Sequence, residues 1–268
     1  MKVALLGLGS VGRGVAQVLS DHAYGFVITA AADSRSGAVA APGESLNMDY
    51  VFARKAATGQ CGEAAWNAER IAREAEYDIL VDVTPTNAAT GEPALSTIRA
   101  ALSRGKHVVT SNKGPVSIAS PELARLAAEN NAAFLFEGTV AGAVPIINGL
   151  RHGLAGNRVQ QLFGILNGTC NYILTRMEEE GLTYAQALDE ARDLGYAEAE
   201  PTYDVNGTDA AIKLVILANA VFSMDVTLND VIRIGIDRLT TDALRMAGTT
   251  GHTIRLIASI HPEKRLLE

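Results

Sequence analysis

The chain opens with KVALLGLGSVG, residues 2–12, in which an apolar run leads directly into three glycines. The run at residues 2–6 predicts a strand that is buried on both faces of a sheet. The spacing G-x-G-x-x-G that follows is typical of a turn that binds a dinucleotide. Gly7 makes the tight turn, Gly9 lets the pyrophosphate approach the backbone, and Gly12 lets the next helix pack closely on the strand. The N-terminus of that helix then faces the phosphates.

A second apolar run, residues 26–32, ends in Asp33, about 20 residues after the glycines, where a ribose-binding acid is expected. An acid at this point favours NAD, because it would repel the 2′-phosphate of NADP. Arg35, two residues later, could accept that phosphate or could be a solvated loop cation. The sequence therefore predicts NADP or NAD as the cofactor and leaves the choice between them open.

Strands and helices alternate through the first half of the chain. Further strands are expected at residues 78–83, 107–110 and 133–136, and helices at 11–19, 47–58, 63–75, 91–104 and 121–129. This alternation predicts an α/β protein with a Rossmann-type doubly wound parallel sheet. Ligands of such sheets bind at the carboxyl ends of the strands.

The second half has a different pattern, with expected helices at residues 145–152, 170–179, 184–194 and 240–246 and strands at 158–166 and 253–260. We expect a dinucleotide-binding domain at 1–144 and an α+β substrate-binding and dimerisation domain at 145–268. The sheet of the second domain is small and needs its face and edges covered, so a homodimer or homotetramer is expected.

Composition excludes several classes of protein. The 268 residues carry a net charge of −7 and contain no basic run with interleaved aromatic residues, which argues against a nucleic-acid or anionic-membrane partner. No apolar stretch reaches the length of a membrane span. Two distant cysteines, Cys61 and Cys170, form no metal-binding motif. A reduced, cytoplasmic protein that acts on a small molecule is expected.

Two turns that follow predicted strands carry candidate functional residues. Lys113 lies in SNKGP, residues 111–115, where a lysine points into the crevice of such a sheet more often than elsewhere. Glu137 begins EGTVAGAVP, residues 137–145, whose small residues let backbone carbonyls turn inward. Glu137 and those carbonyls could hold a hard cation, although a plain packing turn is the alternative.

The stretch from residue 195 to residue 213, GYAEAEPTYDVNGTDAAIK, concentrates acids before one lysine. Glu198 and Asp204 are expected on a loop, and Asp209 begins an apolar-periodic helix. Asp209 and Lys213 are four residues apart and share one face of that helix. The set suits a small polar ligand with an amino group; a solvated acidic turn with a surface ion pair is the alternative.

These motifs together resemble the homoserine dehydrogenase family, and the resemblance covers essentially the whole chain. The matching stretches are GLGSVG (7–12), TPTN (84–87) with GEPAL (91–95), GKHVVTSNKGP (105–115), the turn at 137–145, NGTCNYILTRM (167–177) and GYAEAEPTYDVNGTDAAIKL (195–214). The resemblance implies the interconversion of L-homoserine and L-aspartate 4-semialdehyde by hydride transfer with NAD(P). This reaction belongs to the biosynthesis of threonine, methionine and isoleucine.

The resemblance also implies a role for each matching residue. The nucleotide would be held by Gly7, Leu8, Gly9, Ser10, Val11 and Gly12, with Thr84 and Ser111 along it. Lys113 would lie at the nicotinamide and substrate, and Lys213 would transfer the proton. Glu198 and Asp209 would hold the substrate, with Asp204 supporting the loop. A sodium-type structural cation would be bound by Glu137 with the carbonyls near Val140, Gly142 and Val144.

Two departures from the family pattern qualify these expectations. Glu200-Pro201 stands where the family often has Asp-Pro. The family normally continues for several tens of residues beyond the equivalent of Glu268 and has a glycine-rich end, so the second domain is expected to be incomplete. The alternative function is therefore a non-catalytic NAD(P)-binding homologue or an inactive truncated form.

Overall fold

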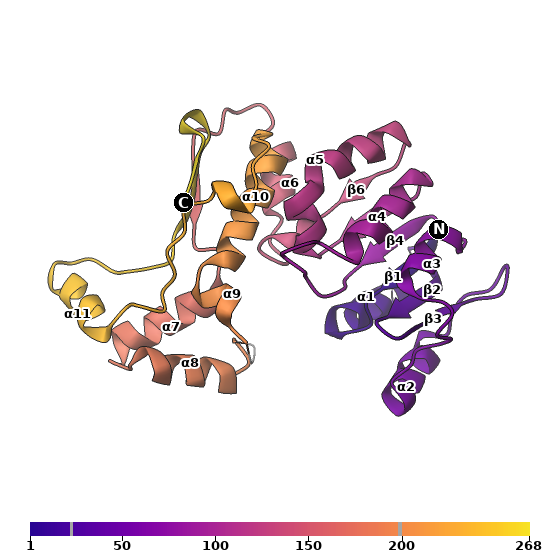
Figure 1. The fold of residues 1–268 in the computed structure, drawn as a ribbon, viewed down its shortest axis with the longest axis horizontal. Helices are drawn as coiled ribbons and strands as arrows, with labels where there is room; N and C mark the ends of the chain where they lie inside the picture. The colour runs from indigo at the N-terminus through magenta and orange to yellow at the C-terminus, as the bar shows by residue number, and fades with distance from the viewer. Residues whose placement is uncertain (22–23, 198–199) are drawn as a thin grey trace. The chain divides into compact units, whose positions relative to one another are not determined.

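The computed structural model describes residues 1–21, 24–197 and 200–268, which form two compact units, Met1–Ile146 and Ile147–Glu268. The boundary between the units lies two residues after the one expected from the sequence. Figure 1 shows the helices and strands of the two units. Each unit has its own sheet and its own hydrophobic core.

Unit 1 alternates strands and helices along its length. Its elements are β1 (Lys2–Leu6), α1 (Ser10–Asp21), β2 (Val27–Asp33), β3 (Ser36–Val39), α2 (Met48–Thr58), α3 (Ala68–Glu74), β4 (Ile79–Asp82), α4 (Ala94–Ser103), β5 (His107–Thr110), α5 (Lys113–Glu129), β6 (Phe134–Leu135) and η1 (Glu137–Thr139). The short helix α6 (Ile146–Asn148) spans the boundary with unit 2.

The six strands of unit 1 lie in one sheet in the order β3-β2-β1-β4-β5-β6. All neighbouring pairs are parallel except β2 and β3, which are antiparallel. Strands β2 and β3 lie on one side of β1, and β4, β5 and β6 lie on the other. Ligands of such sheets bind at the carboxyl end of the strand where the order reverses, which here is β1. The predicted Rossmann-type fold is thus confirmed, with one antiparallel edge strand that the sequence pattern did not reveal.

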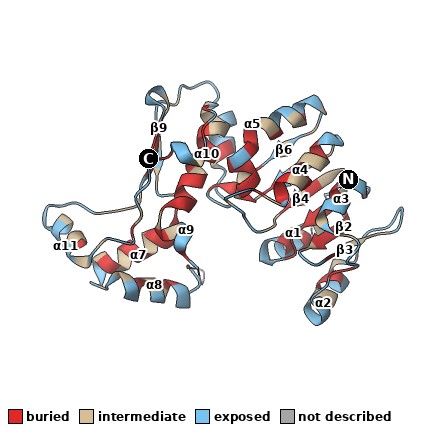
Figure 2. Ribbon diagram, in the orientation of Figure 1, coloured by how far each residue is buried: buried red, intermediate tan, exposed pale blue. Residues whose placement is uncertain are grey.

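Alternate residues of the central strands face opposite sides of the sheet, and each side has its own core. Ala4 and Leu6 pack with α3, α4 and α5, whereas Val3 and Leu5 pack with α1 and α2. Most of these strand residues are fully buried (Figure 2). Helices therefore cover both faces, which explains why the strands read as continuous apolar runs rather than alternating ones.

The start of a predicted helix of unit 1 differs most from the structure in two cases. The helix expected at residues 63–75 begins only at Ala68, because Glu63 pairs with Gly37 in an isolated β-bridge. The helix expected at 121–129 is the second half of α5, which starts at Lys113 and has non-helical φ and ψ at Ala119, two residues before Pro121. Proline lacks an N–H and disrupts the helical turn before it. The sequence pattern therefore predicts that a helix starts at Pro121, whereas in the structure the helix continues across the kink.

Unit 2 surrounds one long helix. Its elements are η2 (Gly149–Gly153), β7 (Leu162–Gly164), α7 (Gly168–Glu179), α8 (Tyr184–Asp193), α9 (Thr202–Val205), α10 (Thr208–Phe222), η3 (Leu228–Asp230), α11 (Thr241–Thr249), β8 (Ala258–His261), η4 (Pro262–Lys264) and β9 (Leu266–Leu267). Strands β7, β8 and β9 form an antiparallel sheet, and α10 is buried along most of its length (Figure 2). The strands expected at residues 158–166 and 253–260 are shorter in the structure.

Among the residues that the structure describes, no helix is long and apolar enough to span a lipid bilayer.

Candidate active site

The glycine turn joins β1 to α1 at the carboxyl edge of the large sheet. Gly7 has a φ of 96°, and a Cβ atom there would lie 2.6 Å from the carbonyl oxygen of Val83. A Cβ atom on Gly12 would lie 1.9 Å from the carbonyl oxygen of Gly7, whereas one on Gly9 would meet no atom within 4 Å. Gly7 and Gly12 are therefore required by the turn, and the backbone at Gly9 is open to an approaching group. This geometry fits a pyrophosphate at the N-terminus of α1.

The three side chains between these glycines lie in different surroundings. Leu8 is buried in the core under α1 and α2, and Ser10 and Val11 are exposed in the first turn of α1. Leu8 thus anchors the turn, whereas Ser10 and Val11 face outward. Their contact with the nucleotide stays a prediction.

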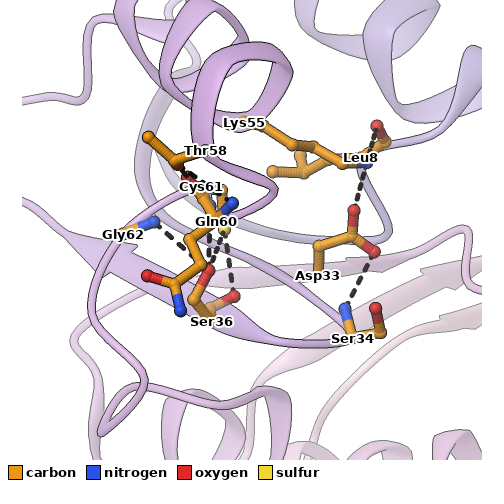
Figure 3. A network of polar contacts seen from close by, with 9 residues as sticks. All are labelled: Leu8, Asp33, Ser34, Ser36, Lys55, Thr58, Gln60, Cys61 and Gly62. Atoms are coloured by element: carbon orange, nitrogen blue, oxygen red, sulfur yellow. Dashed lines mark hydrogen bonds and ion pairs between the residues drawn. The ribbon is translucent and has the colours of Figure 1, made fainter.

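A lysine that the sequence motifs did not single out, Lys55 of α2, lies beside the predicted ribose-binding acid (Figure 3). Its Nζ forms an ion pair with Asp33 at the end of β2 and donates a hydrogen bond of 2.7 Å to the carbonyl oxygen of Leu8. The Asp33 carboxylate also accepts a hydrogen bond of 2.9 Å from the backbone N–H of Ser34. One ammonium group therefore links the glycine turn to the strand end where a ribose would lie.

Arg35 follows on the turn after β2 and is exposed. Its guanidinium lies near Gly59, the residue that ends α2. The turn after β2 and helix α2 thus bring two cations, Arg35 and Lys55, to the part of the fold where NAD and NADP differ. No local pattern indicates Lys55, because only the packing of α2 against the sheet brings it to Asp33.

The ends of β4 and β5 bring together the other predicted cofactor residues of unit 1. Asp82 pairs with Thr110 in the sheet, so the turns that carry Thr84 and Lys113 start at the same edge. The Thr84 hydroxyl donates a hydrogen bond of 2.6 Å to the Asp82 carboxylate, and the backbone N–H of Ser111 donates one of 3.1 Å to the Asp82 carbonyl oxygen. Lys113 is the first residue of α5. The positions of Thr84, Ser111 and Lys113 along the nucleotide stay predictions.

The predicted cation ligands lie on the turn after β6. The Glu137 carbonyl oxygen accepts a hydrogen bond of 3.4 Å from the N–H of Val140, and that of Val144 accepts one of 2.8 Å from Ile146. Gly142 has a φ of 59°, so the backbone reverses there. The part of the chain that the structure describes has no cluster of three or more His, Cys, Asp or Glu side chains that could hold a metal ion. A sodium ion bound by Glu137 and backbone carbonyls stays a prediction.

In unit 2, Asp209 and Lys213 form an ion pair of 2.7 Å on the first turns of α10. The exposed fractions of the Lys213 and Asp209 side chains are only 17% and 11%, so the pair is not a solvated surface contact. The Lys213 Nζ also donates a hydrogen bond of 2.6 Å to the carbonyl oxygen of Leu166. A buried lysine that is fixed by two acceptors at the start of a buried helix suits a ligand site better than a surface role.

Asn167, the first residue of the NGTCNYILTRM motif, connects the acids of this site. Its Nδ2 donates hydrogen bonds of 2.7 Å to Asp204 Oδ1 and 2.9 Å to Asp209 Oδ2. Its Oδ1 accepts a hydrogen bond of 2.8 Å from the backbone N–H of Cys170 and so caps α7. One buried amide therefore holds two carboxylates close together. The sequence motifs assign Asn167 no role, because its contacts with Asp204 and Asp209 join segments that are distant in sequence.

The acidic stretch before α10 differs in part from the loop expected there. Asp204 lies in the short helix α9, and Gly207, with a φ of 81°, turns the chain into α10. The structure thus brings Asp204, Asp209 and Lys213 together around Asn167. Glu198, the predicted partner of the substrate amino group, lies outside the described residues.

Cys170 lies next to these carboxylates in surroundings that do not favour a nucleophilic thiol. Its side chain is fully buried, and its Sγ donates a hydrogen bond of 3.2 Å to the carbonyl oxygen of Asp204. Burial, with the nearby charges of Asp204 and Asp209, raises the pKa of Cys170 to about 12. A thiol that is buried and stays protonated at neutral pH is a poor nucleophile, which argues against covalent catalysis through this cysteine.

Comparisons with known proteins agree with this arrangement. Residues 145–267 match the homoserine dehydrogenase family model, and residues 7–137 match the NAD-binding domain of homoserine dehydrogenase. The homoserine dehydrogenase of Methanocaldococcus jannaschii is 40% identical over 272 residues, an alignment that covers 97% of this chain and 80% of the relative.

Two solved structures extend the comparison to the fold. A putative homoserine dehydrogenase from Archaeoglobus fulgidus has a TM-score of 0.90 and 40% identity over 100% of this chain and 82% of its own. A hyperthermophilic archaeal homoserine dehydrogenase in complex with NADPH has a TM-score of 0.82 and 27% identity, over 99% and 79% of the two chains. With both family models and these relatives matched over nearly its full length, this chain belongs to the homoserine dehydrogenase family.

Proposed function

We propose that this chain interconverts L-homoserine and L-aspartate 4-semialdehyde with NAD(P), in the biosynthesis of threonine, methionine and isoleucine. The observation that carries the proposal is the buried Asp209–Lys213 pair, which Asn167 holds together with Asp204. Oxidation of an alcohol needs a group that takes the hydroxyl proton, and the reverse reaction needs an acid at the same oxygen. Lys213 supplies this group.

Some residues of unit 2 bind the substrate, and Lys213 transfers the proton. Lys213 has three N–H donors, of which Asp209 and the Leu166 carbonyl use two, so the third can point to a substrate oxygen. Asp209 and Glu198 hold the substrate, with Asp204 supporting them. The role of Lys113 of unit 1 at the nicotinamide and substrate stays a prediction. NAD(P), when bound along the glycine turn, supplies the hydride acceptor.

The proposal is tested by the homoserine-dependent reduction of NAD or NADP, followed by absorbance, with other small alcohols as controls. Turnover that requires homoserine supports it. Binding of NADPH without any response to homoserine, in a folded preparation, would identify a non-catalytic nucleotide-binding protein instead. A cytoplasmic location stays a prediction.

Lys55 and Asp33 provide a test of cofactor choice. We expect Lys55→Met to weaken NADPH binding about tenfold or more and NADH binding much less, because a 2′-phosphate loses a charged hydrogen-bond donor. Asp33→Asn should shift the preference the other way, since it removes a repulsive charge near that phosphate. Fluorescence titration with NADPH and NADH gives the four dissociation constants. If Lys55→Met weakens both nucleotides equally, Lys55 only supports the glycine turn.

The small sheet of unit 2 supports the expected homodimer or homotetramer. Phe163 of β7 lies opposite Ser259 of β8. Ile165 lies two residues from Phe163 and Ile257 two residues from Ser259, each just beyond the end of its strand, so strand alternation predicts that they share the face of Phe163. These three apolar side chains are 69%, 47% and 56% exposed. Such a patch marks an interaction site, and a second copy of the chain is the partner we propose.

Sedimentation velocity checks this assignment. The parental chain should sediment as a dimer or tetramer at micromolar concentration, and Phe163→Asp should produce monomers, because it introduces a charge into the apolar patch. A parental chain that is wholly monomeric would contradict the assignment.

A further inference from the structure

Asp82, at the end of β4, is a buried charged residue to which neither the sequence motifs nor the proposed function gives a role. Its side chain is fully buried, and it forms no ion pair among the described residues. Its Oδ1 accepts hydrogen bonds from the Thr84 hydroxyl, 2.6 Å, and from the Thr84 N–H, 3.2 Å. Its Oδ2 accepts one of 3.0 Å from the Thr110 hydroxyl. Burying a carboxylate without an ion pair is costly, so such a residue is normally found only where its oxygens are needed to accept hydrogen bonds.

An ionised carboxylate can only accept hydrogen bonds, and this fixes the direction of both hydroxyl groups. Burial raises the pKa of Asp82, and the hydrogen bonds from Thr84 and Thr110 act against that rise. With both hydroxyl protons directed at Asp82, the two hydroxyl oxygens are free to accept hydrogen bonds on their other side. Asn112 is the donor to both oxygens.

Asn112 donates hydrogen bonds to both hydroxyl oxygens and also caps α5, so it connects the threonines to that helix. Its backbone N–H donates to the Thr110 Oγ1, 2.9 Å, and its Nδ2 donates to the Thr84 Oγ1, 3.0 Å, and to the carbonyl oxygen of Pro85, 3.2 Å. Its Oδ1 accepts a hydrogen bond of 3.0 Å from Gly114 and caps α5. Every polar group of the Asn112 amide is therefore used, and the cap cannot turn without breaking the chain of hydrogen bonds.

The capped turn has little room to move. A Cβ atom on Gly114 would lie 2.6 Å from the carbonyl oxygen of Asn87, so the start of α5 packs directly on the turn after β4. Lys113 lies between Asn112 and Gly114, within the first turn of the capped helix. The position of its backbone thus depends on the hydrogen bonds that begin at Asp82.

We infer that Asp82 is a positioning residue: through Thr84, Thr110 and Asn112 it orients the turn that presents Lys113 to the substrate. The inference rests on the proposed function for the role of Lys113. It adds to that function a buried carboxylate that acts at a distance, without touching substrate or cofactor.

Asp82→Asn tests the inference with almost no change in shape. The amide keeps one acceptor and replaces the other by a donor, so one threonine hydroxyl must reverse and meet an N–H of Asn112. We expect kcat to fall about tenfold or more, the cost of misplacing a catalytic group, with less change in the KM for homoserine. The amide of Gly114 should exchange with deuterium roughly fivefold faster, as expected for a weakened helix cap.

Asp78→Asn is the matched control, because Asp78 accepts a hydrogen bond of 2.7 Å from the backbone N–H of Lys2 at the opposite end of the same strands. It should leave kcat and the exchange of Gly114 unchanged. Thr110→Val should reproduce the effect of Asp82→Asn, and the double variant should be no worse than either single variant, since both break one chain of hydrogen bonds.

Three outcomes would overturn the inference. They are unchanged exchange at Gly114 in Asp82→Asn, faster exchange throughout unit 1, and effects of Asp82→Asn and Thr110→Val that simply add. The exchange measurement needs no substrate, so it decides the role of Asp82 in orienting the turn even if the parental chain fails to oxidise homoserine. That failure would count against the proposed function alone.

Discussion

Lys213→Ala is expected to lower kcat about a hundredfold or more, the range for losing a general acid–base group. The lysine lies in the carboxylate site of unit 2, where it contacts Asp209 at 2.7 Å and the Leu166 carbonyl at 2.6 Å. NADPH binding should change little, because the glycine turn belongs to unit 1. The measurement is kcat and kcat/KM against pH.

Lys213→Arg separates proton transfer from folding. Loss of Lys213 leaves Asp209 buried without its cation, and such a change can destabilise a protein by several kcal/mol. Arginine keeps the positive charge but stays protonated at any accessible pH, so it cannot take the hydroxyl proton. We expect a similar loss of kcat with near-parental thermal stability. Lys264→Ala, an exposed lysine of η4, serves as the control. Parental kcat and an unaltered pH profile for Lys213→Arg would show that another group transfers the proton.

Gly12→Ala is expected to abolish most cofactor binding. The new methyl group would lie 1.9 Å from the backbone carbonyl oxygen of Gly7. A Cβ atom has no rotamer that could avoid this contact, so α1 must move away from β1. A displacement of about 1 Å in a positioning group costs roughly a hundredfold, and we expect NADPH affinity to fall by that factor. The crowding should also lower the free energy of unfolding by at least about 2 kcal/mol.

Gly14→Ala, on the same helix, provides the matched control. A Cβ atom there would meet no atom within 4 Å, and the residue is exposed. Alanine is the better helix former, so this variant should gain up to about 1 kcal/mol and bind NADPH like the parental chain. Thermal unfolding and NADPH titration of both variants check the pair. Equal affinity of Gly12→Ala and Gly14→Ala for NADPH would mean that the close contact at Gly12 is not needed for the site.

The sequence predicts the features of this fold that depend on local pattern. Buried parallel strands read as apolar runs, and Gly7 and Gly12 have no substitute because a backbone atom occupies the place of a side chain. That Asp209 and Lys213 share one helical face follows from helical spacing alone. For these residues, one short segment contains all the information that is needed.

The remaining features depend on contacts between distant segments. Lys55 reaches Asp33 only because α2 packs beside β2, and the amide of Asn167 reaches Asp204 and Asp209 from a different helix. Strand β3 escaped prediction because its small residues, SGAV, pair with β2 at the sheet edge without an apolar run of their own. Such pairings depend on how segments far apart in sequence come together, which neither propensity nor periodicity describes.

Asn167 is followed by Gly168, a dipeptide prone to deamidation because glycine does not hinder attack of its own backbone nitrogen on the asparagine side chain. In this fold the side-chain oxygen caps α7 and the amide nitrogen donates to two carboxylates, so the side chain is held away from the reactive geometry. Unfolding removes this protection, and the lesion is visible as a mass gain of the peptide that carries Asn167. The product aspartate would set a third negative charge between Asp204 and Asp209. The chemical integrity of this carboxylate site is therefore tied to the time that the chain spends folded, because unfolding exposes the Asn167 side chain to deamidation.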